Sequence, residues 1–113
     1  MTVKLALLLG MLLPATLVAE EDWQAMDGAQ IAAALTDRKV QYAQAWQEFK
    51  ASGRTLYNAD QDSWGYWRVE RDQYCSQWPP SDLWACYDMA RAGDRLRFMG
   101  PSGDVTEGVY ADD

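Results

Sequence analysis

The residues of this chain that could do chemistry are its carboxylates, its two cysteines and its aromatic side chains, because none of the 113 residues is a histidine. Without an imidazole, Ser-His and Cys-His nucleophilic systems are excluded, and zinc loses its commonest nitrogen ligand. A serine with a lysine base is not indicated either, since neither Lys39 nor Lys50 stands in a Ser-x-x-Lys arrangement. We therefore expect no nucleophilic catalytic set and no cofactor.

Carboxylates leave one catalytic alternative, a small hydrolase of the glycosidase type. Such an enzyme pairs an acid of raised pKa with a second carboxylate. Five acidic residues lie among the tryptophans along the chain: Glu48, Glu70, Asp72, Asp82 and Asp88. A chain of this size offers little depth for a saccharide cleft, and acidic side chains usually form a solvated face. The favoured interpretation is therefore non-enzymatic.

One segment repeats the spacing of oxygen ligands in a calcium loop. Asn58, Asp60 and Asp62 occupy alternate positions, as the first ligands of such a loop do. The match then fails, because Ser63 stands where the sharp turn needs Gly and Val69 stands where a bidentate Glu is needed. We expect a polar loop over residues 58–63 and no metal centre, with weak calcium binding as the alternative.

The chain is unusually rich in large aromatic residues, with six tryptophans and six tyrosines in 113 residues. Several rings must fill the core of a small domain, but six indole N–H groups are hard to bury together. The remaining rings would form an aromatic patch suited to protein anchors or to stacking on sugar rings. The candidate binding surface consists of Arg54, Tyr57, Trp64, Trp67, Trp78 and Trp84, with Trp64 and Trp78 the most exposed.

Cys75 and Cys86 are the two cysteines of this chain. In an oxidising compartment a pair with no competitor should form a disulfide. A redox-active pair would need Cys-x-x-Cys spacing, which is absent. The sequence therefore predicts one structural disulfide.

The N-terminal sequence indicates export to such an oxidising compartment. Residues 1–19 combine Lys4, an apolar run from Leu5 to Leu13 and small residues ending at Ala19, which is the layout of a signal peptide. The apolar run is too short to cross a bilayer, which needs about 20 residues. The sequence predicts a periplasmic or secreted protein without a membrane anchor.

Removal of 19 residues leaves 94, enough for one domain. We expect an extended or disordered segment over residues 20–27 and a single β domain over residues 28–113. Only Lys4 is lost among the charged residues, so the formal charge changes from −7 to −8. A domain of this sign repels phosphate backbones and anionic lipid, so nucleic acid and membrane surfaces are not expected partners.

The elements that must position these residues follow from periodicity. Good helix formers predict a helix from about Asp27 to Thr36, with Asp27 as its cap. A period of two then indicates short strands near residues 39–43, 47–50, 55–57, 65–69, 73–78, 95–99 and 105–110. Residues 83–90 could be helix or strand, and the proximity required by a disulfide favours strand. The predicted fold is mainly β, an antiparallel meander or small barrel with one N-terminal helix.

Several motifs resemble a group of small, uncharacterised secreted proteins of proteobacteria. They are Gly53-Arg-Thr-x-Tyr57, Gly65-x-Trp67, Tyr74-Cys-Ser-x-Trp-Pro-Pro80, Trp84-x-Cys86-Tyr and Arg97-Phe98, with Gly103 and Gly108. Members look like β-meander domains without assigned activity, and some carry the label dihydrodipicolinate reductase. That enzyme needs a Gly-x-Gly-x-x-Gly run after a strand, and this chain contains none.

A fainter similarity is to periplasmic lysozyme inhibitors, through Ser52-Gly53, Tyr57 and a disulfide-bearing barrel. Their Trp-x-Lys-Gly run has no counterpart, because Trp67 is followed by Arg68 and Val69. The leading hypothesis is a non-enzymatic binding module for a protein or an envelope glycan. The alternatives are a carboxylate hydrolase, a lysozyme-inhibitor-like protein and a structural envelope protein without a ligand.

Overall fold

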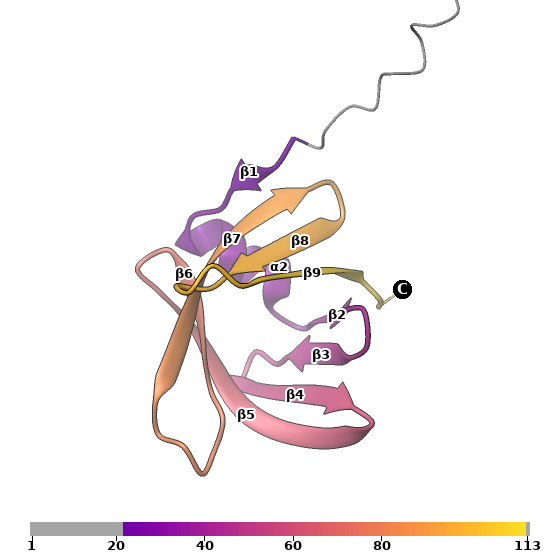
Figure 1. The fold of residues 1–113 in the computed structure, drawn as a ribbon, viewed down its shortest axis with the longest axis vertical. Helices are drawn as coiled ribbons and strands as arrows, with labels where there is room; N and C mark the ends of the chain where they lie inside the picture. The colour runs from indigo at the N-terminus through magenta and orange to yellow at the C-terminus, as the bar shows by residue number, and fades with distance from the viewer. Residues whose placement is uncertain (1–21, 113) are drawn as a thin grey trace, which may run out of the picture.

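The computed structural model describes residues 22–112, so the predicted signal peptide lies outside the described residues. The described chain forms one short helix and nine strands (Figure 1). In chain order these are β1 (Gln24–Ala25), α2 (Gly28–Leu35), β2 (Arg38–Gln41), β3 (Trp46–Phe49), β4 (Arg54–Ala59), β5 (Gln61–Glu70), β6 (Gln73–Gln77), β7 (Trp84–Ala92), β8 (Arg95–Met99) and β9 (Val105–Tyr110).

Strands β2 to β9 close into an eight-stranded antiparallel barrel. Each strand pairs with the next one along the chain, and β9 returns to β2 with Val40 opposite Tyr110 and Gln41 opposite Val109. Closure leaves the barrel without a free edge. The predicted fold class is confirmed, and its barrel form is the one that the chain adopts.

A glycine makes the seam between β9 and β2 possible. A Cβ atom on Gly108 would lie 2.5 Å from Cγ1 of Val40 and 3.0 Å from the carbonyl oxygen of Gln41, both on β2. A side chain at this position would hold the two strands apart. Gly108 therefore allows β9 to approach β2 closely enough to complete the barrel.

Helix α2 begins where the sequence predicts. The Asp27 carboxylate accepts a hydrogen bond from the Gln30 backbone N–H, and the Gln30 side chain accepts one from the Asp27 N–H, which forms a capping box. The helix buries Ile31, Ala34 and Leu35. Within the described residues, no helix is long and apolar enough to span a membrane.

Helix α2 covers one end of the barrel. The Gly28 N–H donates to the Asp72 carboxylate in the turn between β5 and β6, at 2.7 Å. The Tyr110 hydroxyl at the end of β9 donates to the carbonyl oxygen of Ala34, at 2.8 Å. These bonds hold the helix across the strand ends, and we call this side of the barrel the closed end.

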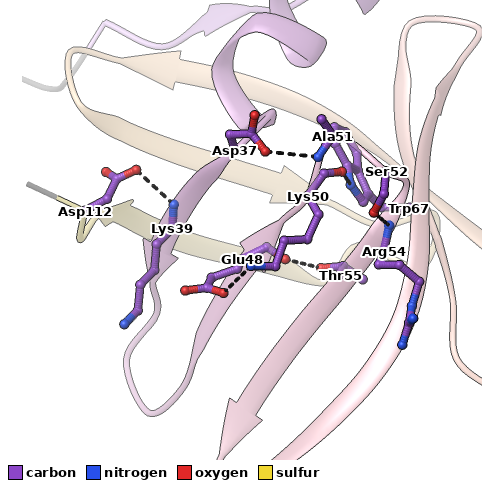
Figure 2. Close-up of polar contacts among 10 residues, drawn as sticks. All are labelled: Asp37, Lys39, Glu48, Lys50, Ala51, Ser52, Arg54, Thr55, Trp67 and Asp112. Atoms are coloured by element: carbon purple, nitrogen blue, oxygen red, sulfur yellow. Dashed lines mark hydrogen bonds and ion pairs between the residues drawn. The ribbon is translucent and has the colours of Figure 1, made fainter.

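The turn between β3 and β4 belongs to the same end and is fixed from both sides (Figure 2). The Asp37 carboxylate, just after α2, accepts from the Ala51 N–H at 3.1 Å. The Trp67 indole N–H donates to the carbonyl oxygen of Lys50 at 2.9 Å. The indole ring thereby satisfies its one polar group while its apolar surface remains in the core.

The closed half of the barrel holds the hydrophobic core. The Phe49 ring contacts the Trp67 and Tyr74 rings edge-on, with centroid distances of 5.6 and 5.7 Å. Aliphatic side chains from the helix and the strands fill the remaining space: Met26, Ile31, Leu35, Val40, Met89 and Leu96. The core therefore lies between α2 and the middle of the barrel.

Three details of the secondary structure were open or differ from expectation. The polar loop predicted over residues 58–63 is wrong, because β4 continues to Ala59 and β5 begins at Gln61. Asp60 alone makes the turn, with a φ of 83° that short Asp side chains tolerate. Residues 84–92 form strand β7, which confirms the choice of strand. Strand β1, which pairs with β7 through Gln24 and Ala25, was not predicted.

The predicted disulfide is present between directly opposed residues. Cys75 of β6 and Cys86 of β7 face each other in the antiparallel ladder and are bonded, with a Cα to Cα distance of 4.0 Å. The bond crosslinks two neighbouring barrel strands across the loop that contains Pro79 and Pro80. It closes a short loop, with a sequence separation of 11.

We expect Gly108→Ala to lower the free energy of unfolding by about 1–3 kcal/mol, because the new methyl group overpacks the seam against Val40. Urea denaturation checks this value. Val109→Ala, at an exposed position of the same strand, is the matched control and should change stability less. Equal stability of wild type and Gly108→Ala would contradict the role of the seam.

Replacing both cysteines, as Cys75→Ala with Cys86→Ala, should lower the free energy of unfolding by a little under about 3 kcal/mol, since the short crosslinked loop then gains its full freedom in the unfolded chain. Urea denaturation of this variant and of the reduced wild type should give similar midpoints. A reduced wild type as stable as the oxidised one would contradict a structural disulfide.

Candidate functional site

The end of the barrel opposite α2 contains a cavity of about 1020 Å³. Its lining residues come from the loops that join β2 to β3, β6 to β7 and β8 to β9, and from the strands next to them. Aromatic residues from seven segments line it: Tyr42, Tyr57, Trp64, Tyr74, Trp78, Tyr87 and Phe98. We call this side of the barrel the open end.

Strand alternation brings these side chains inside. On β3, Gln47 and Phe49 are buried while the residues beside them are more exposed, and Phe49 lies deeper toward α2. On β6, Tyr74 and Ser76 both line the cavity and are two residues apart. The same period of two therefore supplies the core at the closed end and the cavity wall at the open end.

The cavity floor is a network of uncharged polar groups centred on Gln47. The Tyr42 hydroxyl donates to Oε1 of Gln47 at 2.7 Å. Nε2 of Gln47 donates to the Thr55 hydroxyl at 2.9 Å and to the Tyr74 hydroxyl at 3.0 Å. The amide thus uses its oxygen and both of its hydrogens, so burial of Gln47 leaves no polar atom unsatisfied.

The phenols of this floor stay neutral. Burial holds the pKa of the Tyr42 hydroxyl well above its ordinary value. Burial also raises the pKa of Tyr74 to about 12, against the opposing effect of its hydrogen bonds to Ser76 and Gln47. Both hydroxyls are protonated at any physiological pH and serve as hydrogen-bonding groups rather than as bases.

Trp78 forms one wall of the cavity in a fixed orientation. Its indole N–H donates to the Ser76 hydroxyl at 3.1 Å. Its ring lies over Gly65 of β5, where a Cβ atom would be 2.6 Å from Cε3 of the indole. It contacts the Tyr57 ring edge-on, at a centroid distance of 6.0 Å. The ring is therefore positioned by the protein before any ligand binds.

Two further hydroxyls face this space without a protein partner. Within residues 22–112, the hydroxyl groups of Tyr57 and Tyr87 form no hydrogen bond. Both side chains line the cavity and are half-buried. Their hydroxyls are available to water or to a ligand.

Two acidic residues are among the lining residues, one in the loop before β9 and one within β9. They are Asp104 and Glu107. Glu107 forms ion pairs with Arg97 at 2.6 Å and with Arg95 at 2.8 Å. Hydrogen bonds from Arg97, and then from Arg95, lower the pKa of the Glu107 carboxyl. No lysine or arginine lines the cavity in the described chain.

The sequence-predicted surface is divided among three places. Tyr57 and Trp78 lie in the cavity. Trp67 lies in the core with only 8% of its surface exposed, so its assignment to a binding surface is wrong. The Trp67 ring can be buried because its indole N–H donates to the backbone carbonyl oxygen of Lys50.

The other predicted residues lie on the outside of the barrel. Trp64 is 45% exposed and also reaches the cavity mouth, with the Arg54 guanidinium 4.7 Å from its ring centroid. Figure 2 shows the Arg54 side chain directed away from the contacts of the β3–β4 turn. Trp84 is covered by the Arg68 guanidinium at 3.9 Å.

Sequence reasoning missed the floor of the cavity. Tyr42, Gln47, Tyr74 and Tyr87 were placed in strands, but no role was predicted for them. The available signal was a polar residue, Gln47, at an inward position of an alternating strand. An amide there requires buried partners, and phenol hydroxyls provide them.

The calcium-like residues form a hairpin end instead of a loop. Asn58 and Asp62 are opposite each other on β4 and β5, and the Asn58 amide N–H donates to the Asp62 carboxylate at 2.8 Å. Asp60 occupies the turn between them. This hydrogen bond links the two strands next to the turn.

The acids named for a hydrolase do not meet at the cavity. None of the five is among its lining residues. Glu48 pairs with Lys50, Glu70 pairs with Arg68, and Asp88 accepts from the Gln73 amide. Among the described residues, the one cluster with metal-ligand proximity is Glu70 with Cys75 and Cys86, whose sulfur atoms form the disulfide.

Glu107→Gln should make the protein less stable at pH 7, by under about 1 kcal/mol as for partly exposed ion pairs. The folded pKa of Glu107 is lowered, so its pairs stabilise the protein above the ordinary value near 4.5 and lose this effect as the pH falls through the lowered pKa. Urea denaturation across this range should show the two proteins converging at low pH. A pH-independent difference would contradict this assignment.

Comparison with known proteins returns no matching family model, no similar curated protein and no similar solved structure. The resemblance to secreted proteobacterial proteins therefore stays a prediction from the motifs. What the chain can do has to be inferred from the cavity itself.

Proposed function

We propose that this protein is a non-enzymatic binding module whose ligand enters the open end of the barrel. The observation that carries this proposal is the cavity of about 1020 Å³ with its aromatic walls and uncharged polar floor. Ligand sites are typically concave, of about 300–1,000 Å³, and lined by apolar rings with a few oriented polar groups. The open end has this composition.

The state of the polar groups favours binding over catalysis. Gln47 and the phenols of Tyr42 and Tyr74 are neutral and engage one another, so none is poised to move a proton. The five acidic residues considered for a glycosidase lie elsewhere on the barrel, and of the two acids at the cavity Glu107 is paired with Arg95 and Arg97. The site therefore provides a ligand with a concave surface, aromatic rings to pack against and neutral hydrogen-bonding groups.

The form of the site favours a small ligand, or the end of an envelope glycan, over a protein surface. A stable protein contact buries about 800 Å² on each partner across a broad patch. Here the groups that lack a partner, such as the Tyr57 and Tyr87 hydroxyls, face a hollow inside the barrel. A glycan end could enter this hollow.

The compartment that we propose is the periplasm or the extracellular space. The disulfide between Cys75 and Cys86 supports it, because such bonds persist in oxidising compartments. The signal peptide predicted from residues 1–19 supports the same location.

Titration with two kinds of neutral probe tests this function: the dye N-phenyl-1-naphthylamine, followed by fluorescence, and chitin oligosaccharides, followed by calorimetry. Saturable binding of either probe supports the proposal. We expect saturable binding to the mature protein and about tenfold or greater weakening by Trp78→Ala, because a central aromatic wall is lost. Trp84→Ala is the matched control, since Trp84 lies outside the cavity under Arg68. Absence of saturable binding, or equal weakening by both variants, would overturn the proposal.

A further inference from the structure

We infer that the cavity at the open end is a site for an uncharged sugar, held by hydroxyl groups and aromatic rings. This inference rests on the proposed function and names the class of ligand for it. Three independent features of the cavity support it: its charge, the kind of hydrogen-bonding groups it leaves available, and the placement of its rings.

The charge of the lining disfavours anionic ligands. Among the described residues, no lysine or arginine lines the cavity, and the whole chain carries a formal charge of −7. A carboxylate or phosphate in the cavity would lack a cationic partner, and burying an unpaired charge is costly. Anionic sugars and phosphorylated compounds should therefore bind weakly.

Cationic ligands meet a similar difficulty. The Glu107 carboxylate is already paired with Arg95 and Arg97. The Asp104 carboxylate lies against Gly100 of its own loop. The floor contains Gln47 with its neutral phenol partners, so a buried ammonium group would find no carboxylate beside it.

The available hydrogen-bonding groups are hydroxyls. Tyr57 and Tyr87 have hydroxyls without protein partners in the described chain. Each can both donate and accept, as sugar hydroxyls do. A purely alkyl ligand would strip water from these groups without replacing its hydrogen bonds.

The rings provide the complementary apolar surface. The Trp78 indole, fixed by Ser76 and Gly65, stands beside the edge-on Tyr57 ring. A sugar ring has an apolar C–H face and a hydroxyl periphery. One such ring can pack against the indole while its hydroxyls bind the free hydroxyls of Tyr57 and Tyr87.

The decisive experiment compares three β-1,4-linked disaccharides by isothermal titration at pH 6. They are neutral N,N′-diacetylchitobiose, cationic chitobiose with free amines, and the anionic disaccharide of N-acetylglucosamine and N-acetylmuramic acid. We expect the neutral disaccharide to bind at least about tenfold more tightly than either charged one, because only it avoids an unpaired charge. Tighter binding of a charged disaccharide would overturn the inference.

Two variants test the hydroxyl groups. Tyr57→Phe and Tyr87→Phe keep the rings, so each should weaken binding of N,N′-diacetylchitobiose about three- to tenfold through the loss of one hydrogen bond. Tyr66→Phe, on the exposed outer face of β5, is the matched control and should leave binding unchanged. Equal effects of all three variants would overturn the inference.

An apolar neutral dye, N-phenyl-1-naphthylamine, separates the inference from the proposed function. Binding of the dye in a manner that Trp78→Ala weakens, with no binding of N,N′-diacetylchitobiose, would overturn the sugar inference and leave the binding site in place. If neither the dye nor any of the three disaccharides binds, the sugar inference and the proposed function are both overturned.

Discussion

Closure of β9 onto β2 is the contact on which the rest of the structure depends. It joins the last strand of the meander to the first, and it needs Gly108 because Val40 and the carbonyl group of Gln41 occupy the space of any side chain there. Once closed, the barrel has a fixed interior with two ends. Helix α2 can cover only one of them, and the inward side chains at the other end then surround a cavity.

Gln47 marks the boundary between these two halves. Below it, toward α2, Phe49 packs against Trp67 in a dry core. Above it, phenols and an indole surround open space. A buried amide would destabilise this layer if it were unsatisfied, but Tyr42, Thr55 and Tyr74 occupy its polar atoms. The partners that make Gln47 tolerable thus also form the floor of the site.

Most of the barrel could be predicted because alternation and turn residues act locally. Seven of the eight barrel strands correspond to segments with a period of two, β7 was assigned from the disulfide, and Asp27 caps α2 as its chemistry requires. The error at residues 58–63 has a physical cause. Asn58 and Asp62 face each other across the β4–β5 hairpin, so their polarity reflects a solvated strand pair that composition cannot distinguish from a loop. Strand β1 escaped detection because two residues carry no period.

The site was harder to predict because the fate of each tryptophan depends on residues far away in sequence. Trp67 enters the core because the Lys50 carbonyl oxygen receives its N–H, a contact between different hairpins. Four others are covered outside the barrel by cations that sequence alone does not place beside them: Trp23 by Arg97, Trp46 by Lys39, Trp64 by Arg54 and Trp84 by Arg68. Trp78 is the sixth. In the described chain no cation lies over its ring, which packs over Gly65 and lines the cavity. Tertiary neighbours thus decide which surface each tryptophan presents.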